Sequence, residues 1–143
     1  MESPRIVVFD GDCGLCNGFV AWLVRHDRAA LHLLAGSGGK AGRAVVRRAG
    51  LSPEITASTI ILWNGERAIL RSDAVIDIVS ALGWPWRGAR ILRWVPRGLR
   101  DAIYAQAARR RPRIEGDPVC GVPPRELAQE WRRRLASVED AAA

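Results

Sequence analysis

Short apolar runs recur through the first half of the chain and predict four strands. Each run is followed by polar or turn-forming residues, as strands in a sheet usually are. The runs lie at 6–9, 31–34, 59–63 and 67–70. Asn64-Gly65 lies between the last two runs, and this pair is a strong hairpin signal because a type I′ turn needs positive φ at both positions. The last two strands should therefore form an antiparallel hairpin.

Apolar residues at helical spacing fill most of the remaining chain. The first helix follows the first strand, places Leu15, Phe19 and Leu23 on one face, and ends near His26. Ser72 is expected to cap the third helix, because a serine just before an apolar-periodic segment is typical of a helix N-cap. The helices predicted after the first one span 40–49, 72–82, 87–95, 97–111 and 125–138.

The predicted order is β-α-β-α-β-β-α, followed by additional C-terminal helices. Strands joined by a helix pair in parallel and a hairpin pairs antiparallel, so we expect an α/β fold with a central mixed sheet and helices on both faces. This is the element order of the thioredoxin fold. One domain is expected from 143 residues. We place it at 1–115, including the extra helices at about 87–111, and interpret 116–143 as a C-terminal tail.

Two cysteines stand where the first strand passes into the first helix, in the segment Phe9-Asp10-Gly11-Asp12-Cys13-Gly14-Leu15-Cys16. The first turn of a helix has unpaired N–H groups and partial positive charge, and both favour the thiolate, which is the reactive form of cysteine. A Cys13–Cys16 disulfide would close almost no loop and add little stability, so redox chemistry is the better interpretation. We expect Cys13 to be the more exposed thiol and the one that attacks, with Cys16 resolving the mixed disulfide.

Three further side chains are candidates for this chemistry. Asp10, at the end of a buried strand, either relays protons during exchange or accepts backbone N–H groups in the loop. Asp12 is best explained as the N-cap of the first helix, with an accessory catalytic role as the alternative. Cys120 lies in a loop-rich segment and is either a third thiol that accepts the disulfide or a buried, inert cysteine.

Two other interpretations use the same residues. The cysteines could bind a metal or a partner protein without catalysis, but a zinc site needs four ligands. Cys120 has no matching spacing, and His26 and His32 are expected to be packing or surface residues. An apolar strand followed by Asp-x-Asp is also similar to the start of haloacid-dehalogenase-like phosphatases, which would make Asp10 and Asp12 the catalytic pair. No later acidic pair suited to magnesium follows, so this remains a minor alternative.

The basic charge does not indicate a different function. The net charge is +7, and arginine supplies nearly all of the positive charge. The arginine-rich stretch 87–113 contains no nucleic-acid-binding motif, so we expect a solvated basic face and no specific nucleic-acid binding. Trp84, Trp86 and Trp94 stand among these arginines. We expect them to pack between helices rather than to enter a membrane interface.

The sequence resembles the DCC family of thioredoxin-like proteins over roughly 5–123. The matching residues are Phe9 to Cys16, Asp27, Ser58 to Leu62, Ser72, Val95 to Tyr104, Arg109, Arg110 and Cys120 to Pro123. The resemblance implies a thioredoxin-like fold and thiol-disulfide oxidoreductase activity at Cys13 and Cys16. The late motif contains Arg100, Asp101 and Tyr104, which we interpret as a polar network that anchors the extra helices to the core, because charge on a buried helix must be paired.

Thioredoxins carry a cis-proline just before their third strand, where it contacts peptide substrates, and Thr56-Ala57-Ser58 stands at that place here.

We expect protein or small-molecule disulfides and thiols as substrates, with no cofactor and no metal. No run of about 18 apolar residues predicts a transmembrane helix. The N-terminus lacks a signal-peptide layout, so a cytoplasmic location is expected.

Overall fold

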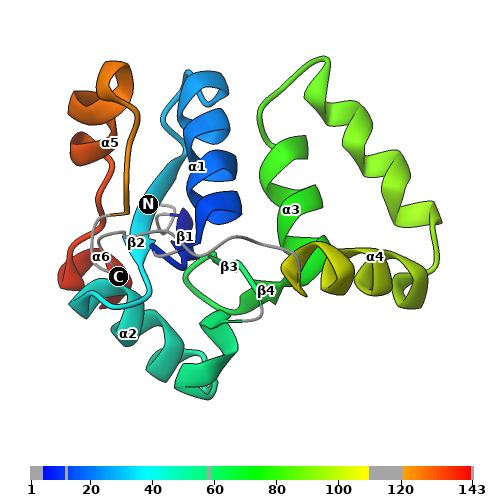
Figure 1. Ribbon diagram of the computed structural model, residues 1–143, viewed down its shortest axis with the longest axis horizontal. Helices are drawn as coiled ribbons and strands as arrows, with labels where there is room; N and C mark the ends of the chain where they lie inside the picture. Colours follow the sequence, from blue (N-terminus) through cyan, green and yellow to red (C-terminus); the bar gives the residue numbers. More distant parts are fainter. Residues whose placement is uncertain (1–4, 12, 58, 110–120, 143) are drawn as a thin grey trace.

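A four-stranded sheet lies between helices (Figure 1). The structure, a computed structural model, describes residues 5–11, 13–57, 59–109 and 121–142. The strands are β1 (Arg5–Phe9), β2 (His32–Gly36), β3 (Ile61–Trp63) and β4 (Ala68–Leu70). The α-helices are α1 (Gly14–His26), α2 (Lys40–Arg48), α3 (Arg71–Ser80), α4 (Arg97–Arg109), α5 (Ala128–Arg133) and α6 (Val138–Ala142). Short 3₁₀ helices are η1 (Pro53–Ala57), η2 (Trp86–Trp94) and η3 (Arg125–Leu127).

The sheet has the order β2-β1-β3-β4, so β1 lies at its centre. β1 pairs with β2 in parallel, with Phe9 opposite Gly36, and with β3 antiparallel, with Val8 opposite Ile61. β3 and β4 pair antiparallel. The predicted α/β fold with a central mixed sheet is therefore confirmed, and its arrangement is compatible with a thioredoxin-like fold. The parallel pairing places the ends of β1 and β2 at the same edge, where α1 begins.

The alternation of side chains along β1 builds a separate core on each face of the sheet. Val7 and Phe9 pack in one core with residues of α1 and α3, whereas Ile6 and Val8 pack in the other with residues of α2. Figure 1 shows α1 and α3 on one side of the sheet and α2 on the other. Because both faces of β1 are buried, its apolar run is continuous rather than alternating.

The β3–β4 hairpin forms, but the predicted type I′ turn is wrong. Trp63 pairs with Ala68, so the loop spans 64–67 rather than two residues. Gly65 has a φ of +96°, whereas Asn64 does not adopt positive φ. The Asn64 side chain instead accepts hydrogen bonds from the backbone N–H groups of Glu66 and Arg67, at 2.9 and 3.0 Å. This side-chain turn makes the second positive φ unnecessary.

Ser72 does not cap α3 as expected, because the helix begins at Arg71 with Leu70 as its N-cap residue. The Ser72 hydroxyl donates instead to Asp101 on α4, at 2.6 Å, and accepts from Arg100 at 3.1 Å. Arg100 also pairs with Asp73 at 2.8 Å, and this hydrogen bond lowers the pKa of Asp73. The expected polar network that anchors α4 is therefore present, and Ser72 belongs to it.

The tryptophans of the arginine-rich segment divide into two groups. Trp86 packs edge-on against Trp22 of α1, with ring centroids 4.9 Å apart, as expected for a packing residue. For Trp84 and Trp94 the prediction is wrong, because they are 78% and 85% exposed. The predicted helix over 87–95 is a 3₁₀ helix, η2, in which no residue is buried. Its outer side chains therefore remain in solvent.

The C-terminal residues pack into the same core as the sheet. The single helix expected over 125–138 is interrupted after α5, because Arg134–Ala136 run beside β2. Leu34 donates its N–H to the Arg134 carbonyl at 2.6 Å and accepts the Ala136 N–H at 2.7 Å. Trp131 of α5 is fully buried, and its ring meets Phe9 edge-on at 5.9 Å. The side-chain core around β1 therefore includes a residue from far along the chain.

A buried polar cluster joins the end of α1 to β2 and α5. Asp27 accepts the backbone N–H groups of Leu31 and His32, both at 3.0 Å, and contacts His32 Nδ1 at 3.1 Å and Arg134 at 3.4 Å. His32 Nε2 accepts a hydrogen bond from Arg5 at 3.2 Å. Arginine only donates, so Nδ1 carries the His32 proton and donates it to Asp27. His32 is thus a fully buried member of a polar network.

Candidate functional site around Cys13 and Cys16

Cys13 is the N-cap residue of α1, the position that we had expected Asp12 to occupy. Its sulfur accepts the backbone N–H of Cys16 at 3.2 Å, and its own N–H donates to the Asp10 carbonyl at 3.1 Å. Both cysteines are free thiols. The Cys13 sulfur therefore meets an N–H group of the first helical turn, where the N–H groups have no intrahelical acceptor and carry the positive end of the helix dipole.

The exposure of the two thiols is the reverse of the prediction. Cys13 is buried with no exposed surface, whereas Cys16 is partly exposed and packs against the core between α1 and the sheet. The N-cap position turns the Cys13 side chain back over the helix start to meet the Cys16 N–H, and this brings the sulfur inside. The sulfur with the stabilising N–H contact is therefore not the one that solvent reaches first.

The other predicted site residues have different outcomes. Asp10 is buried at the carboxyl end of β1, and its carbonyl closes the turn that leads to Cys13. The Asp10 backbone therefore lies in the turn directly before the dithiol. Asp12 and Cys120 lie outside the described residues, so their suggested accessory roles stay predictions.

Asn17 is a buried site residue that the sequence analysis missed. Its side-chain amide donates to the carbonyls of Gly11 and Cys13, at 2.8 and 2.9 Å. Its carbonyl oxygen accepts the backbone N–H of Val122 at 2.7 Å. One side chain therefore holds the cysteine loop and ties it to a segment 105 residues later. An asparagine one turn into a helix gives no sequence signal for such a contact.

Gly121 sits against the same loop. Its φ is +74°, and a Cβ atom built there would lie 2.6 Å from Phe9 and 2.7 Å from the Asn17 side-chain oxygen. Only a glycine allows this backbone conformation and this close approach together. Gly121 and Val122 of the Cys-x-x-Pro motif at 120–123 therefore lie beside the loop that carries Cys13, and the glycine was the available sequence signal.

Gly121→Ala is expected to destabilise the protein by more than Gly50→Ala. Gly50 also has positive φ, +72°, but a Cβ there meets nothing within 4 Å, so only backbone strain of about 1–2 kcal/mol is expected. At Gly121 the clash with Phe9 and Asn17 should add a further 1–3 kcal/mol or so. Denaturant titration measures both variants. Equal losses would show that the packing of Gly121 against the cysteine loop contributes nothing.

The family motif from Val95 to Tyr104 also reaches this edge of the sheet, through Tyr104 of α4. The Tyr104 hydroxyl accepts the backbone N–H of Ile60 at 2.8 Å. Thr59 receives the Arg71 N–H at 2.7 Å, and it precedes β3 on the side where β1 ends. Thr59 and Tyr104 thus hold the start of β3, where thioredoxins place their cis-proline.

Comparisons with known proteins show the family of this chain. The family profile described as DCC1-like thiol-disulfide oxidoreductase matches residues 7–117. The uncharacterized protein YuxK of Bacillus subtilis (strain 168) is 29% identical over 107 residues, covering 75% of this chain and 77% of that protein. A chloroplastic DCC family protein of Arabidopsis thaliana is 32% identical over 111 residues, covering 77% of this chain but only 64% of that protein. No solved structure matches the chain. The chain belongs to the DCC1-like thiol-disulfide oxidoreductase family.

Proposed function

We propose that the protein catalyses thiol-disulfide exchange through Cys13 and Cys16. The observation that carries the proposal is the Cys16 N–H aimed at the Cys13 sulfur, 3.2 Å away, in the first turn of α1. This contact stabilises negative charge on sulfur, and the thiolate is the nucleophile in disulfide exchange. Family membership supports the same reaction class. It also favours the dithiol over the alternative phosphatase interpretation of Asp10 and Asp12.

The reaction divides into two exchanges. The Cys13 thiolate attacks one sulfur of a substrate disulfide, which forms a mixed disulfide and releases the other substrate sulfur as a thiolate. Cys16 then loses its proton and attacks the Cys13 sulfur. A Cys13–Cys16 disulfide forms, the second substrate thiolate leaves, and the substrate has gained two electrons. A thiol donor must reduce the pair again, which a reducing compartment such as the expected cytoplasmic location would supply.

Cys13 is assigned the attack because it holds the N–H contact, although Cys16 has more exposed surface. The Cys13 sulfur has no exposed surface, so local opening must precede its reaction with a substrate. Asp10, buried in the turn before Cys13, is proposed as the group that takes the Cys16 proton during resolution. Protein or small-molecule disulfides are the proposed substrates.

Single serine variants test this assignment. Cys16→Ser should accumulate a mixed disulfide on Cys13 when it is mixed with an aromatic model disulfide, because no resolving thiol remains. Cys13→Ser should lose turnover and trap little. Mass spectrometry of intact protein and of peptides identifies the modified residue. Cys120→Ala keeps both motif thiols, and a change in its turnover would make Cys120 a participant.

Two results would contradict the proposal. Turnover that survives in the Cys13→Ser/Cys16→Ser double variant would place the chemistry elsewhere. Stoichiometric zinc in the purified protein, without any reductase activity, would favour the metal-binding alternative. Equal trapping by the two single variants would overturn only the roles of the two thiols.

A further inference from the structure

The segment 84–109, which contains η2 and α4, exposes several of its large apolar side chains to solvent. Six large hydrophobic residues of this segment are exposed, and together we call them the apolar face: Trp84, Ile91, Leu92, Trp94, Leu99 and Ile103. Soluble proteins rarely leave a group of large apolar side chains in water without a function for it. Figure 1 shows η2 and α4 at one end of the long axis of the molecule, opposite α5 and α6, where a flat surface could reach them.

In α4 the polar side faces the protein and the apolar side faces solvent. Its inner side is polar, since Arg100 and Asp101 contact Ser72 and Asp73 on α3 and Tyr104 contacts the start of β3. Its outer side presents Leu99 and Ile103, which are 56% and 62% exposed. An amphipathic surface helix normally has the opposite arrangement, with its apolar stripe toward the core. The outward stripe therefore fits an apolar environment outside this chain.

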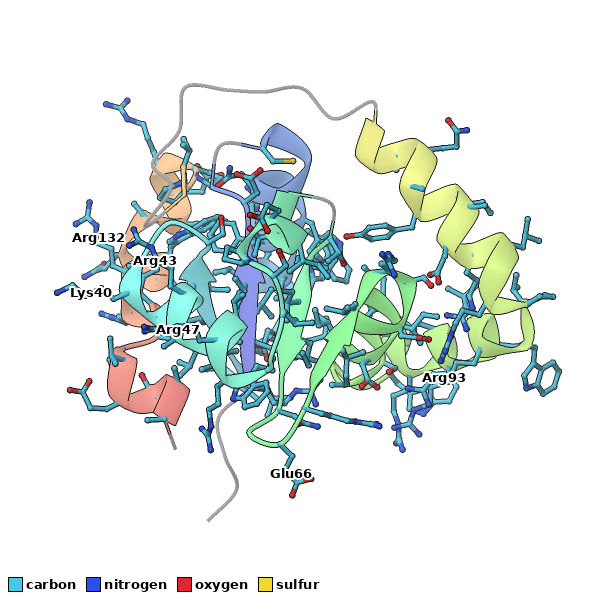
Figure 2. The ribbon with its side chains drawn as sticks, turned by 90° about the horizontal axis from the view of Figure 1, so that it is seen from below. Lys40, Arg43, Arg47, Glu66, Arg93 and Arg132 are labelled. Carbon is cyan, nitrogen blue, oxygen red and sulfur yellow. The ribbon has the colours of Figure 1, made fainter. Side chains whose placement is uncertain are left out.

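The segment that carries the apolar face is rich in arginine. The segment 84–109 contains six arginines and one acidic residue, Asp101. Arg93 and Arg97 form surface ion pairs with Asp77 and Asp73. Arg87 and Arg90 are exposed, and no ion pair is found for either among the described residues. Figure 2 shows Arg93 at the end of the molecule opposite Arg47 and Arg132.

We propose that η2 and α4 form a docking surface for an anionic lipid bilayer. Tryptophan favours the level of the lipid headgroups, aliphatic side chains enter the acyl boundary, and arginine extends its guanidinium to the phosphates. The apolar face and its arginines supply all three components. The protein would lie on the membrane without crossing it, since none of the helices among the described residues is long and apolar enough to span one.

Two other occupants fit the surface less well. A second copy would bring two arginine-rich faces together, and like charges at close range oppose association. Nucleic acid would satisfy the arginines, but Ile91, Leu92, Leu99 and Ile103 have no polar group with which to contact phosphates or base edges. An anionic bilayer accepts both the aliphatic side chains and the positive charge.

Flotation with phospholipid vesicles tests the proposal. The full chain should bind vesicles that contain about one third phosphatidylglycerol, with a blue shift in tryptophan emission, and bind pure phosphatidylcholine much less. Arg87→Gln/Arg90→Gln should weaken binding about 30-fold, at about 1 kcal/mol per arginine. Arg47→Gln/Arg132→Gln removes the same charge at the other end of the molecule and should have a much smaller effect.

A second pair of variants tests the apolar contribution. Ile103→Ser should weaken vesicle binding by at least about tenfold, since it removes an isoleucine side chain that would be buried in the lipid on binding. Leu31→Ser, at an exposed leucine outside the apolar face, should leave binding unchanged. Circular dichroism verifies that each variant is folded.

Several outcomes would overturn the proposal. They are binding to neither vesicle, equal binding to both vesicles, self-association by sedimentation without vesicle binding, or tight binding to duplex DNA with no vesicle binding. The Cys13→Ser/Cys16→Ser variant should bind vesicles like the unmodified protein, so docking and thiol exchange are tested independently.

Discussion

Trp131→Ala is expected to lower the free energy of unfolding by about 3–5 kcal/mol. Trp131 has no exposed surface and lies in the core that α1 and α3 form over the sheet, edge-on to Phe9. Removing the indole leaves a large cavity, and the surrounding β1, β2 and α1 side chains cannot collapse into it without losing their own contacts. Urea titration followed by circular dichroism measures the loss.

Trp94→Ala provides the matched control, since it removes the same atoms from an exposed position. We expect it to change the free energy of unfolding by no more than about 0.5 kcal/mol. If the two variants were equally stable, α5 would not be part of the core around β1. An unchanged m-value in both titrations would show that the transition still covers the same structure.

Asp27→Asn is expected to cost a similar amount, about 3–5 kcal/mol. Asp27 is buried and accepts hydrogen bonds from two backbone N–H groups, His32 and Arg134. One carboxylate oxygen receives three of these donors. The amide nitrogen of asparagine can only donate, so at this position it would leave those donors without an acceptor. Arg134 would also keep a buried charge with less compensation.

The contribution of Asp27 should depend on pH. Burial alone would raise the pKa of Asp27, but the hydrogen bonds from His32 and from the Leu31 and His32 N–H groups more than offset it, so the pKa lies below its usual value. Between this lowered pKa and about 3.9, the unfolded state binds more protons than the folded state. The stabilisation is therefore complete above about pH 4 and is lost as the pH falls through the folded pKa.

Thermal or urea unfolding of Asp27→Asn between pH 2 and 7 examines this expectation. The gap between the unmodified protein and the variant should be largest near neutral pH and should narrow in acid. Asp77→Asn, at a partly exposed ion pair with Arg93, should cost no more than about 1 kcal/mol. If both variants lost a similar free energy of unfolding, the buried hydrogen bonds of Asp27 would not contribute more than a surface ion pair does.

The sequence was informative where structure depends on neighbouring residues. The four apolar runs predicted the strands, and the cysteine motif was placed correctly where β1 passes into α1. Details set by a competing local hydrogen bond were wrong. Asn64 bonds its own loop and Ser72 bonds α4, so neither takes the role that its residue type suggested.

Contacts between distant segments were beyond a single sequence. The Asn17–Val122 hydrogen bond joins residues that share no motif. The burial of Cys13 was not predicted either, because helix position alone suggested that its sulfur would be exposed. Trp84 and Trp94 are the opposite case, because they were predicted to be packed and are exposed. Periodicity indicates that a segment has an apolar side, but it does not say whether this chain covers that side.

The position of Trp131 in the core has a consequence for the order of events during synthesis. Phe9 and the apolar side of α1 emerge from the ribosome early, but the ring that covers Phe9 emerges only after β4, α3 and α4 have been made. Until then, this apolar surface lacks its final partner and can associate with other chains. We therefore expect nascent chains halted before α5 to depend on chaperones more than released chains do.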